Sequence, residues 1–266
     1  MNAAKVLTFD VETSPVEAYV WGLWDQNIPI DFIKTDWTIF SWAAKWLGKR
    51  EILFESTGGR GANKVRDDKH LLQGIRDLLD EADIVVAQNG KRFDVKKVNA
   101  RLIQHGIAPP SPYRVIDTLT VAKKYFAFTS NKLAWTSRLL TDTPKSEHKR
   151  FPGFELWKEC LLDNSAAWAE MEKYNKRDVR ATEKLYLKLR PWIDNHPNLG
   201  VYAPGDDDKP HCPKCGSDKM TRWVKRASVK QQGVYWRYCC RMCGGWARGK
   251  LMQLSLGRRR SLLVPE

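Results

Sequence analysis

One apolar stretch near the N-terminus constrains the fold most, because two acids interrupt it. Residues 5–13 read KVLTFDVET, and an apolar run of this length is typical of a strand buried on both faces. Asp10 and Glu12 are two residues apart, so on a strand they point to the same face. Adjacent carboxylates at the edge of a core repel each other, and Mg²⁺ or Mn²⁺, which prefer hard oxygen ligands, would resolve that conflict. In the alternative interpretation, the strand ends at Asp10 and both acids are solvated in a turn near Pro15.

The remainder of residues 1–192 alternates strands with helices. Residues 38–47 and 51–54 predict a β-hairpin, and leucines at helical spacing predict a helix over 67–82. Short strands are predicted at 84–87 and 115–116. Further helices are predicted at 93–105, 118–125, 132–140, 155–162 and 166–189. Antiparallel strands followed by strands that alternate with helices predict a mixed α/β fold.

Two further acids are candidates for the same site. Asp94 opens a helix directly after a predicted buried strand, at the mouth of the sheet, where α/β folds build their sites. On its own it would be interpreted as a helix N-cap. Asp178 lies four residues after Tyr174 in the long helix, so the phenol and the carboxylate share one face; the alternative is an exposed acid in the charged run 176–178. Asp117 is assigned mainly to capping a helix.

These residues resemble the motifs of one nuclease family. The motifs are Asp10-Val11-Glu12, the segment from Asn89 to Phe93-Asp94, and Tyr174 followed four residues later by Asp178. In order and separation they are similar to the three exonuclease motifs of the DEDD superfamily, tyrosine subtype, and to predicted exonucleases of phage and bacterial genomes. The resemblance covers about residues 1–192 and implies a ribonuclease H-like mixed sheet flanked by helices. The histidine subtype is excluded, because Lys173 stands where it requires histidine.

The resemblance also implies a mechanism. The chain would be a two-metal 3′–5′ exonuclease that hydrolyses single-stranded nucleic acid, with DNA favoured, to nucleoside 5′-monophosphates in DNA replication, repair or recombination. Asp10, Glu12 and Asp178 would hold one Mg²⁺ or Mn²⁺, and Asp94 would reach a second ion through water. Tyr174 would orient the attacking water. A structure-specific endonuclease and a non-catalytic nucleic-acid-binding accessory protein on the same fold remain as alternatives.

Five of the six cysteines lie within 32 residues of each other in the C-terminal part of the chain. Cys212 and Cys215 form one C-x2-C pair, and Cys240 and Cys243 form a second after 24 intervening residues. Paired C-x2-C motifs, each followed by glycine, predict one structural Zn²⁺ held by four thiolates. Cys239 is the alternative to Cys240 as a ligand. Between the pairs, residues 220–226 and 234–238 predict two paired strands, as in a zinc ribbon.

Positive charge is concentrated in this region. The formal net charge is +14, and residues 198–266 carry +9 of it, from 14 Lys and Arg against 5 Asp and Glu. A polyanion is the most economical partner, and aromatic residues interleaved with basic ones suit single strands. At least two of the aromatics Trp223, Tyr235, Trp236, Tyr238 and Trp246 are expected to form the ribbon's own core. The candidate nucleic-acid contacts are Asn89, Arg92 and Phe93 beside the second motif, and Arg222, Trp223, Lys225, Arg226, Trp236 and Arg237 in the ribbon.

The composition predicts a division into two domains. Residues 1–197 are assigned to the exonuclease domain, 198–208 to a linker, and 209–266 to a basic four-cysteine zinc ribbon with an Arg-rich tail. No apolar stretch approaches the length of a membrane span, and the N-terminus lacks the pattern of a signal peptide. We therefore expect a cytoplasmic protein with no membrane partner and no small-molecule cofactor. A replication or recombination protein is a candidate partner.

Overall fold

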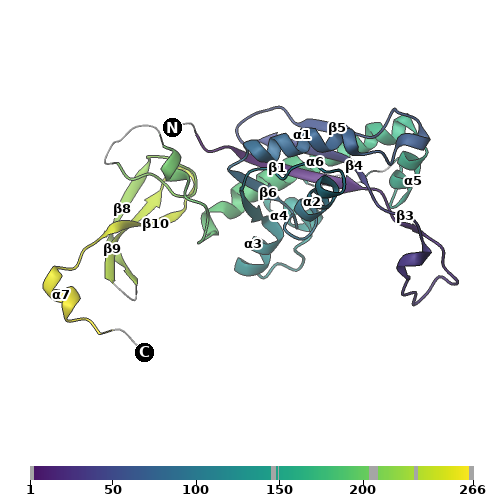
Figure 1. The fold of residues 1–266 in the computed structure, drawn as a ribbon. Helices are drawn as coiled ribbons and strands as arrows, with labels where there is room; N and C mark the ends of the chain where they lie inside the picture. Colours follow the sequence, from purple (N-terminus) through teal and green to yellow (C-terminus); the bar gives the residue numbers. More distant parts are fainter. Residues whose placement is uncertain (1–2, 145–147, 149, 204–208, 231–232, 264–266) are drawn as a thin grey trace. The chain divides into compact units, whose positions relative to one another are not determined.

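The computed structural model describes residues 3–144, 148, 150–203, 209–230 and 233–263 (Figure 1). The chain divides into two compact units, Lys5–Tyr186 and Leu187–Glu266 with Met1–Ala4. The first contains a five-stranded sheet and the second a three-stranded sheet. In the described part of the chain, no helix combines the length and the apolar character needed to cross a membrane.

Strand β1 (Val6–Thr13) lies at the centre of the five-stranded sheet, whose order is β5-β4-β1-β6-β7. It pairs antiparallel with β4 (Ile39–Trp46), and β4 pairs antiparallel with β5 (Leu53–Ser56). On its other side β1 pairs parallel with β6 (Ile84–Ala87), which pairs parallel with β7 (Arg114–Asp117). The sheet is therefore mixed, with its antiparallel part formed by the predicted hairpin.

In the described residues of this unit, six α-helices surround the sheet. They are α1 (Lys69–Glu81), α2 (Asp94–Gln104), α3 (Thr118–Tyr125), α4 (Leu133–Leu140), α5 (Glu155–Leu161) and α6 (Ser165–Leu189). Short additions are β2 (Glu17–Ala18), β3 (Ile33–Thr35) and the 3-10 helices Ile30–Phe32 and Ala62–Lys64. The predicted elements agree with these bounds to within two residues, and the predicted mixed α/β fold is confirmed.

The two faces of the sheet carry different cores. Leu7, Phe9 and Val11 of β1 pack with apolar side chains of α1 and α2 on one face. On the other face, Phe40 of β4 packs with α5 and α6, and its ring meets Trp168 edge to face. Because side chains alternate along a strand, the even-numbered residues of β1 point to the face opposite Phe9 and Val11. Asp10 and Glu12 therefore project from β1 toward the α6 side.

The β1 strand continues past its first acid. In the register with β4, Asp10 is opposite Ala43 and Glu12 is opposite Ser41, and the pairing becomes irregular only between Glu12 and Thr13. The alternative in which the strand ends at Asp10 is wrong. Both acids occupy strand positions, and their common direction is fixed by the backbone.

The C-terminal unit is organised around the antiparallel strands β8 (Met220–Lys230), β9 (Gly233–Cys240) and β10 (Trp246–Met252), in the order β10-β9-β8. The two predicted strands are confirmed, and β10 is an addition. The other elements of this unit are the 3-10 helices Arg190–Trp192 and Leu199–Tyr202, and the short helix α7 (Leu256–Arg260). Part of the predicted linker, residues 204–208, lies outside the described residues.

The expected aromatic core of the ribbon is not observed. The three tryptophans that flank the cysteines in β8, β9 and β10 are exposed, and Tyr235 and Tyr238 are half-buried. Within the described ranges 209–230 and 233–263, Cys212 and Cys240 are the buried apolar side chains. The sheet therefore has its cysteines where a larger domain would have an apolar core.

Candidate active site and cysteine cluster

Three carboxylates converge between β1 and α6. Asp10 and Glu12 project from β1, and Asp178 approaches from the middle of α6, where its side chain is only 2% exposed. One oxygen of each carboxylate lies within 4.8 Å of the others. Three like charges at this separation repel one another, and the donor set suits a hard divalent cation such as Mg²⁺ or Mn²⁺. The residues present therefore fit the metal that the sequence predicts.

Asp94 lies beside this cluster rather than within it. It is the first residue of α2, and Phe93, not Asp94, takes the N-cap position. Its Oδ1 accepts a hydrogen bond of 3.0 Å from the backbone N–H of Val11, the residue between the two acids of β1. Burial raises the pKa of Asp94 to about 7; the Val11 hydrogen bond lowers it, and the charge of Asp117 raises it. A cation nearby would favour the ionised form.

The turn that carries Asp94 is held by Asp117. Besides capping α3, the Asp117 carboxylate accepts hydrogen bonds from the backbone N–H groups of Asn89 (3.0 Å) and Lys91 (3.2 Å). Asn89 has a φ of 64°, a left-handed conformation that asparagine tolerates. At Gly90 a Cβ atom would lie 2.4 Å from the Cβ of Ala87, so a larger residue would push the turn away from β6. Asp117 thus has a second role that sequence reasoning missed.

Tyr174 lies one helical turn before Asp178, and its side chain is buried. Its ring meets the His148 ring at 5.2 Å between centroids and the Trp157 ring at 6.0 Å, both edge to face. These neighbours come from the loop before α5 and from α5 itself. They restrict the orientation of the phenol, and the spacing to Asp178 places both groups on the sheet side of α6.

A second residue of α6 contacts the cluster and was not identified from the sequence. Asn175 is fully buried, and its Nδ2 donates to Asp10 Oδ2 at 2.7 Å and to the Asp10 carbonyl at 3.3 Å. Its Oδ1 accepts from the Ser41 hydroxyl at 3.1 Å. Ser41 is the β4 partner of Glu12. This chain of hydrogen bonds fixes the Asp10 carboxylate and links it to β4.

The candidate contacts near the second motif are at the surface of the first unit. Arg92 is exposed, and the half-buried Phe93 ring lies 5.6 Å from the Lys97 ammonium, which stacks over Trp37 at 3.4 Å. The Asn89 backbone is engaged by Asp117 as described. Basic and aromatic groups are therefore available around Asp94.

Four cysteines converge in the second unit. The Sγ atoms of Cys212, Cys215, Cys240 and Cys243 all lie within 4.8 Å of one another, and the two cross-pairs Cys212–Cys243 and Cys215–Cys240 are each 3.6 Å apart. Thiolates about 2.3 Å from a tetrahedral Zn²⁺ lie about 3.8 Å apart, so the cluster fits that ion. Burial raises the pKa of the Cys215 thiol to about 11.

The two cysteine turns share one backbone conformation. Gly216 and Gly244 follow the pairs with φ of 77° and 73°, in the left-handed region. Each donates its N–H to the carbonyl of the first cysteine of its pair, Cys212 (2.8 Å) and Cys240 (2.9 Å) respectively. Cys239 is not part of the cluster; it lies on β9, where its partner on β10 is Trp246.

The ribbon residues predicted to contact nucleic acid divide between the two faces of the sheet. Trp223 is paired with Arg237, whereas Arg222 is paired with Tyr238 at the neighbouring position, which points the other way. The Arg222 guanidinium stacks on Trp236 at 4.5 Å. Lys225 and Arg226 are exposed in β8. A nucleic acid bound to one face of this sheet therefore could not contact all six of these residues.

Comparison with protein families places this architecture. The family model of the RNase H superfamily matches residues 55–190, a range that includes Asp94, Tyr174 and Asp178 and begins after β1. The chain belongs to the RNase H superfamily. With a carboxylate cluster suited to divalent metals, membership of the RNase H superfamily supports a nucleic-acid-cleaving function.

The predicted ribonuclease H-like fold is therefore confirmed by the family match, and a solved structure has a similar fold. The family B DNA polymerase from the hyperthermophilic archaeon Pyrobaculum calidifontis is similar, with a TM-score of 0.55 and 18% sequence identity. The similarity covers 75% of this chain and 25% of the polymerase, so the chain spans about a quarter of the polymerase's length. At that identity the similarity concerns the fold alone. No curated protein matches the sequence significantly.

Proposed function

We propose that this chain is a metal-dependent 3′–5′ exonuclease that hydrolyses single-stranded nucleic acid, with DNA favoured, to nucleoside 5′-monophosphates. The observation that carries the proposal is the convergence of Asp10, Glu12 and Asp178, with Asp94 hydrogen-bonded to the strand between the first two. The tyrosine one turn before Asp178 supports the tyrosine subtype of the DEDD nucleases. DNA replication, repair or recombination would be the setting for such an activity.

Each carboxylate has a defined part in this proposal. Asp10, Glu12 and Asp178 would hold one Mg²⁺ or Mn²⁺, and Asp10 and Asp94 would hold a second ion. When bound, such ions neutralise charge on the phosphate and lower the pKa of bound water. The protein's own contribution is to hold the donors in place: Asp10 through Asn175, and Asp94 through the Val11 N–H.

Tyr174 would act as a positioning group for the attacking water. A phenol is by itself a poor general base near neutral pH. It can hold a water by a hydrogen bond, and its contacts with His148 and Trp157 keep the ring from turning away.

The two units would divide the work. The nuclease domain, residues 1–197, would carry every residue of the proposed catalytic site, and residues 209–266 would form a zinc ribbon that binds nucleic acid. A formal +9 over residues 198–266 supports this assignment, and four thiolates with one Zn²⁺ would leave +7.

Oligonucleotides labelled at one end test the activity. With Mg²⁺ or Mn²⁺, a 3′-labelled single strand should lose its label at once as a nucleoside 5′-monophosphate, whereas a 5′-labelled strand should shorten through a ladder. Separate reactions with DNA and RNA strands of the same sequence show which nucleic acid is cleaved faster. Omission of added Mg²⁺ and Mn²⁺ is the control. Cleavage of circular single-stranded DNA would indicate an endonuclease instead. Binding without any product under all metal conditions would indicate a non-catalytic accessory protein.

Replacing Asn175 should impair catalysis through Asp10. Partners that orient metal ligands are typically worth 10–100-fold in activity or metal affinity, so Asn175→Ala is expected to lower kcat about 10–100-fold. The substitution leaves the Ser41 hydroxyl without its acceptor, which should cost about 1–3 kcal/mol of unfolding free energy. Steady-state rates at a series of Mg²⁺ concentrations and thermal unfolding measure the two effects separately.

The Mg²⁺ series distinguishes positioning from packing. If Asn175 orients Asp10, the Mg²⁺ concentration for half-maximal rate rises in Asn175→Ala. A loss of stability with an unchanged Mg²⁺ requirement would show that Asn175 only fills space. Lys176→Ala is the matched control, because Lys176 is the next residue of the same helix and its own side chain pairs with Glu172 at the surface.

A further inference from the structure

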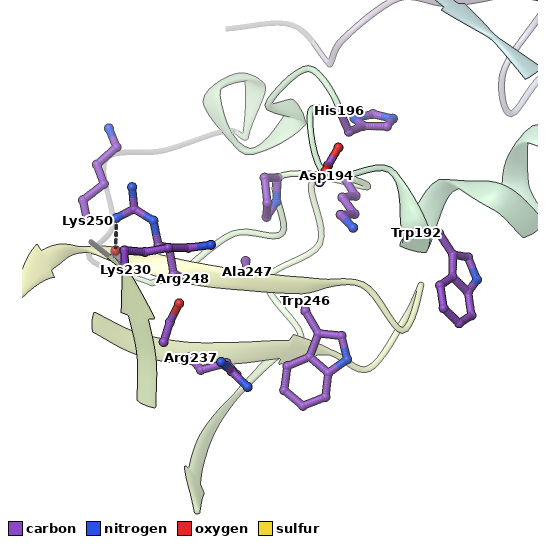
Figure 2. A pocket seen from close by; sticks show the side chains of 13 residues that line it. Trp192, Asp194, His196, Lys230, Arg237, Trp246, Ala247, Arg248 and Lys250 are labelled. Carbon is purple, nitrogen blue, oxygen red and sulfur yellow. Dashed lines mark hydrogen bonds between the residues drawn. The ribbon is translucent and has the colours of Figure 1, made fainter. Parts of the chain in front are cut away.

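The C-terminal unit contains a pocket of about 670 Å³ that no predicted site accounts for (Figure 2). Its walls come from β9, β10, the end of β8, the first cysteine turn and residues 192–196. The basic residues of the lining are Lys214, Lys230, Arg237, Arg248 and Lys250; Asp194 is its one acid. In Figure 2 the Lys230, Arg248 and Lys250 side chains gather on one side of the pocket and the Trp192 indole lies on the other.

Two arginines of this pocket lie close enough to repel each other. Arg237 and Arg248 are directly opposite each other across β9 and β10, and like charges at such positions destabilise a sheet. In the described part of the chain, neither arginine forms an ion pair. Arg248 is nonetheless held in place, with its guanidinium 4.3 Å from the Tyr235 ring centroid. An anion between the two guanidinium groups would replace repulsion by charge-assisted hydrogen bonds.

Lys214 has a different part from the other cations. Its side chain is buried, and its ammonium donates a hydrogen bond to the Pro191 carbonyl. Lys214 thus joins the first cysteine turn to the segment that carries Trp192, and both walls of the pocket belong to one unit.

The pocket also presents aromatic faces. Trp246 is 47% exposed, and its ring is fixed edge to face against Trp223, with 5.4 Å between centroids and planes at 86°. Trp192 is 61% exposed. The Trp246 indole is thus held in place but partly exposed, so it can serve as a stacking platform. Any nucleic-acid base can stack on such a ring, because every base has a π-face.

We propose that this pocket binds single-stranded nucleic acid, with a backbone phosphate between Arg237 and Arg248 and a base stacked on Trp246. A single strand offers both phosphates and bases, and this pocket offers both cations and indoles; an acidic peptide would match the cations but not the indoles. Arg237 is the one predicted ribbon contact that lines the pocket, and Arg248 and Trp246 complete it. This proposal therefore leaves Arg222 and Trp236 outside the interface. The inference rests on the proposed function only in that the bound strand would be the nuclease's substrate.

Two arginines of the same sheet provide a matched test. Arg248 and Arg222 each stack on an aromatic ring, but only Arg248 lines the pocket. The probe is a fluorescein-labelled oligothymidylate, and anisotropy titrations of the full chain are made at several salt concentrations without added Mg²⁺ and without chelator. Arg248→Ala should weaken binding about 10-fold at low salt and flatten the slope of log affinity against log salt by about 0.7. Arg222→Ala should leave both nearly unchanged.

Stacking is tested with a second matched pair. Trp246→Leu should weaken binding about 10-fold without changing the salt slope, because stacking contributes affinity but no counterion release. Trp236→Leu, at an exposed tryptophan outside the pocket, should have little effect. Zinc content is measured for every variant, so that a loss of binding is compared only among folded ribbons.

Three outcomes would overturn the proposal. Equal losses in Arg222→Ala and Arg248→Ala would show diffuse electrostatic binding. An unchanged affinity in both Arg248→Ala and Trp246→Leu would place the strand elsewhere. Stronger competition by a polyglutamate peptide than by unlabelled oligothymidylate would make the pocket a protein-docking site.

Hydrolysis of a dinucleotide separates this proposal from the proposed function. A dinucleotide has a single phosphodiester, and its cleavage needs only the carboxylate site. Arg248→Ala should therefore cleave it at the wild-type rate. If no variant or wild-type protein cleaves it while the binding differences persist, the proposed function fails and the pocket stands.

Discussion

Replacing Asp10 or Asp178 with alanine is expected to lower kcat at least about 10³-fold while leaving the Kd for an oligonucleotide nearly unchanged. Each substitution removes one of three carboxylates whose oxygens lie within 4.8 Å. Metal ions held at such a site contribute several kcal/mol to the stabilisation of the transition state, and about 1.4 kcal/mol corresponds to a factor of ten in rate. Single-turnover cleavage of a 3′-labelled strand measures the rate, and anisotropy measures the binding.

Two variants separate charge from structure in this experiment. Asp10→Asn keeps an oxygen that can accept the Asn175 hydrogen bond but removes the negative charge, so it should lose as much activity as Asp10→Ala. Glu172→Ala removes an acid from the surface of the same helix as Asp178 and should be nearly neutral. Turnover near that of the wild type in Asp10→Ala would mean that the carboxylate cluster is not the catalytic site.

Local patterns in the sequence were sufficient to predict which acids share a face. The alternation of a strand places Asp10 and Glu12 on one side whatever the rest of the chain does, and a spacing of four residues does the same for Tyr174 and Asp178. The predicted buried strand brought Asp94 to the sheet edge. Its hydrogen bond to Val11 required the parallel pairing of β1 and β6, which a single sequence suggests only through the fold class.

The contacts that complete the site are between residues far apart in the chain. Asn175 and Asp10 are separated by 165 positions, and Asn175 and Ser41 by 134. In the sequence, Asn175 stands in the polar run beside Tyr174 and has no feature that distinguishes a buried amide from an exposed one. Its position next to Tyr174 does not decide this, because the residue that follows an inward-facing side chain on a helix lies 100° around the axis and can face either the sheet or the solvent.

The pocket of the C-terminal unit could not be predicted for a related reason. Interpreting residues 220–238 as a pair of strands gave Arg222 and Arg237 equal standing as basic residues. The register of β8 and β9 puts them on opposite faces, and the third strand, β10, marks the face of Arg237 by placing Arg248 opposite it. The strand lies after the second cysteine pair, where Gly249 interrupts a run that otherwise alternates only weakly.

Loss of zinc is expected to unfold the three-stranded sheet of the C-terminal unit and leave the five-stranded sheet intact. Within the described parts of 209–263, Cys212 and Cys240 are the buried apolar side chains, so the sheet lacks an apolar core that could stabilise it alone. Binding of structural zinc typically contributes about 10–16 kcal/mol, which here would be folding free energy. Cys215→Ser removes one thiolate and should release the metal. Zinc content by mass spectrometry and trypsin cleavage at the basic residues of β8 measure the two consequences.

Neighbouring cysteines supply the control. Cys239→Ser should retain zinc and resist trypsin like the wild type, because its Sγ lies outside the cluster, whereas Cys240→Ser should behave like Cys215→Ser. The chain offers this comparison at adjacent positions of one strand, with the same chemical change and opposite faces. Zinc loss in Cys239→Ser and retention in Cys240→Ser would show that the fourth ligand is Cys239. Cleavage of a dinucleotide should survive in Cys215→Ser, since all the carboxylates of the proposed site lie in the other unit.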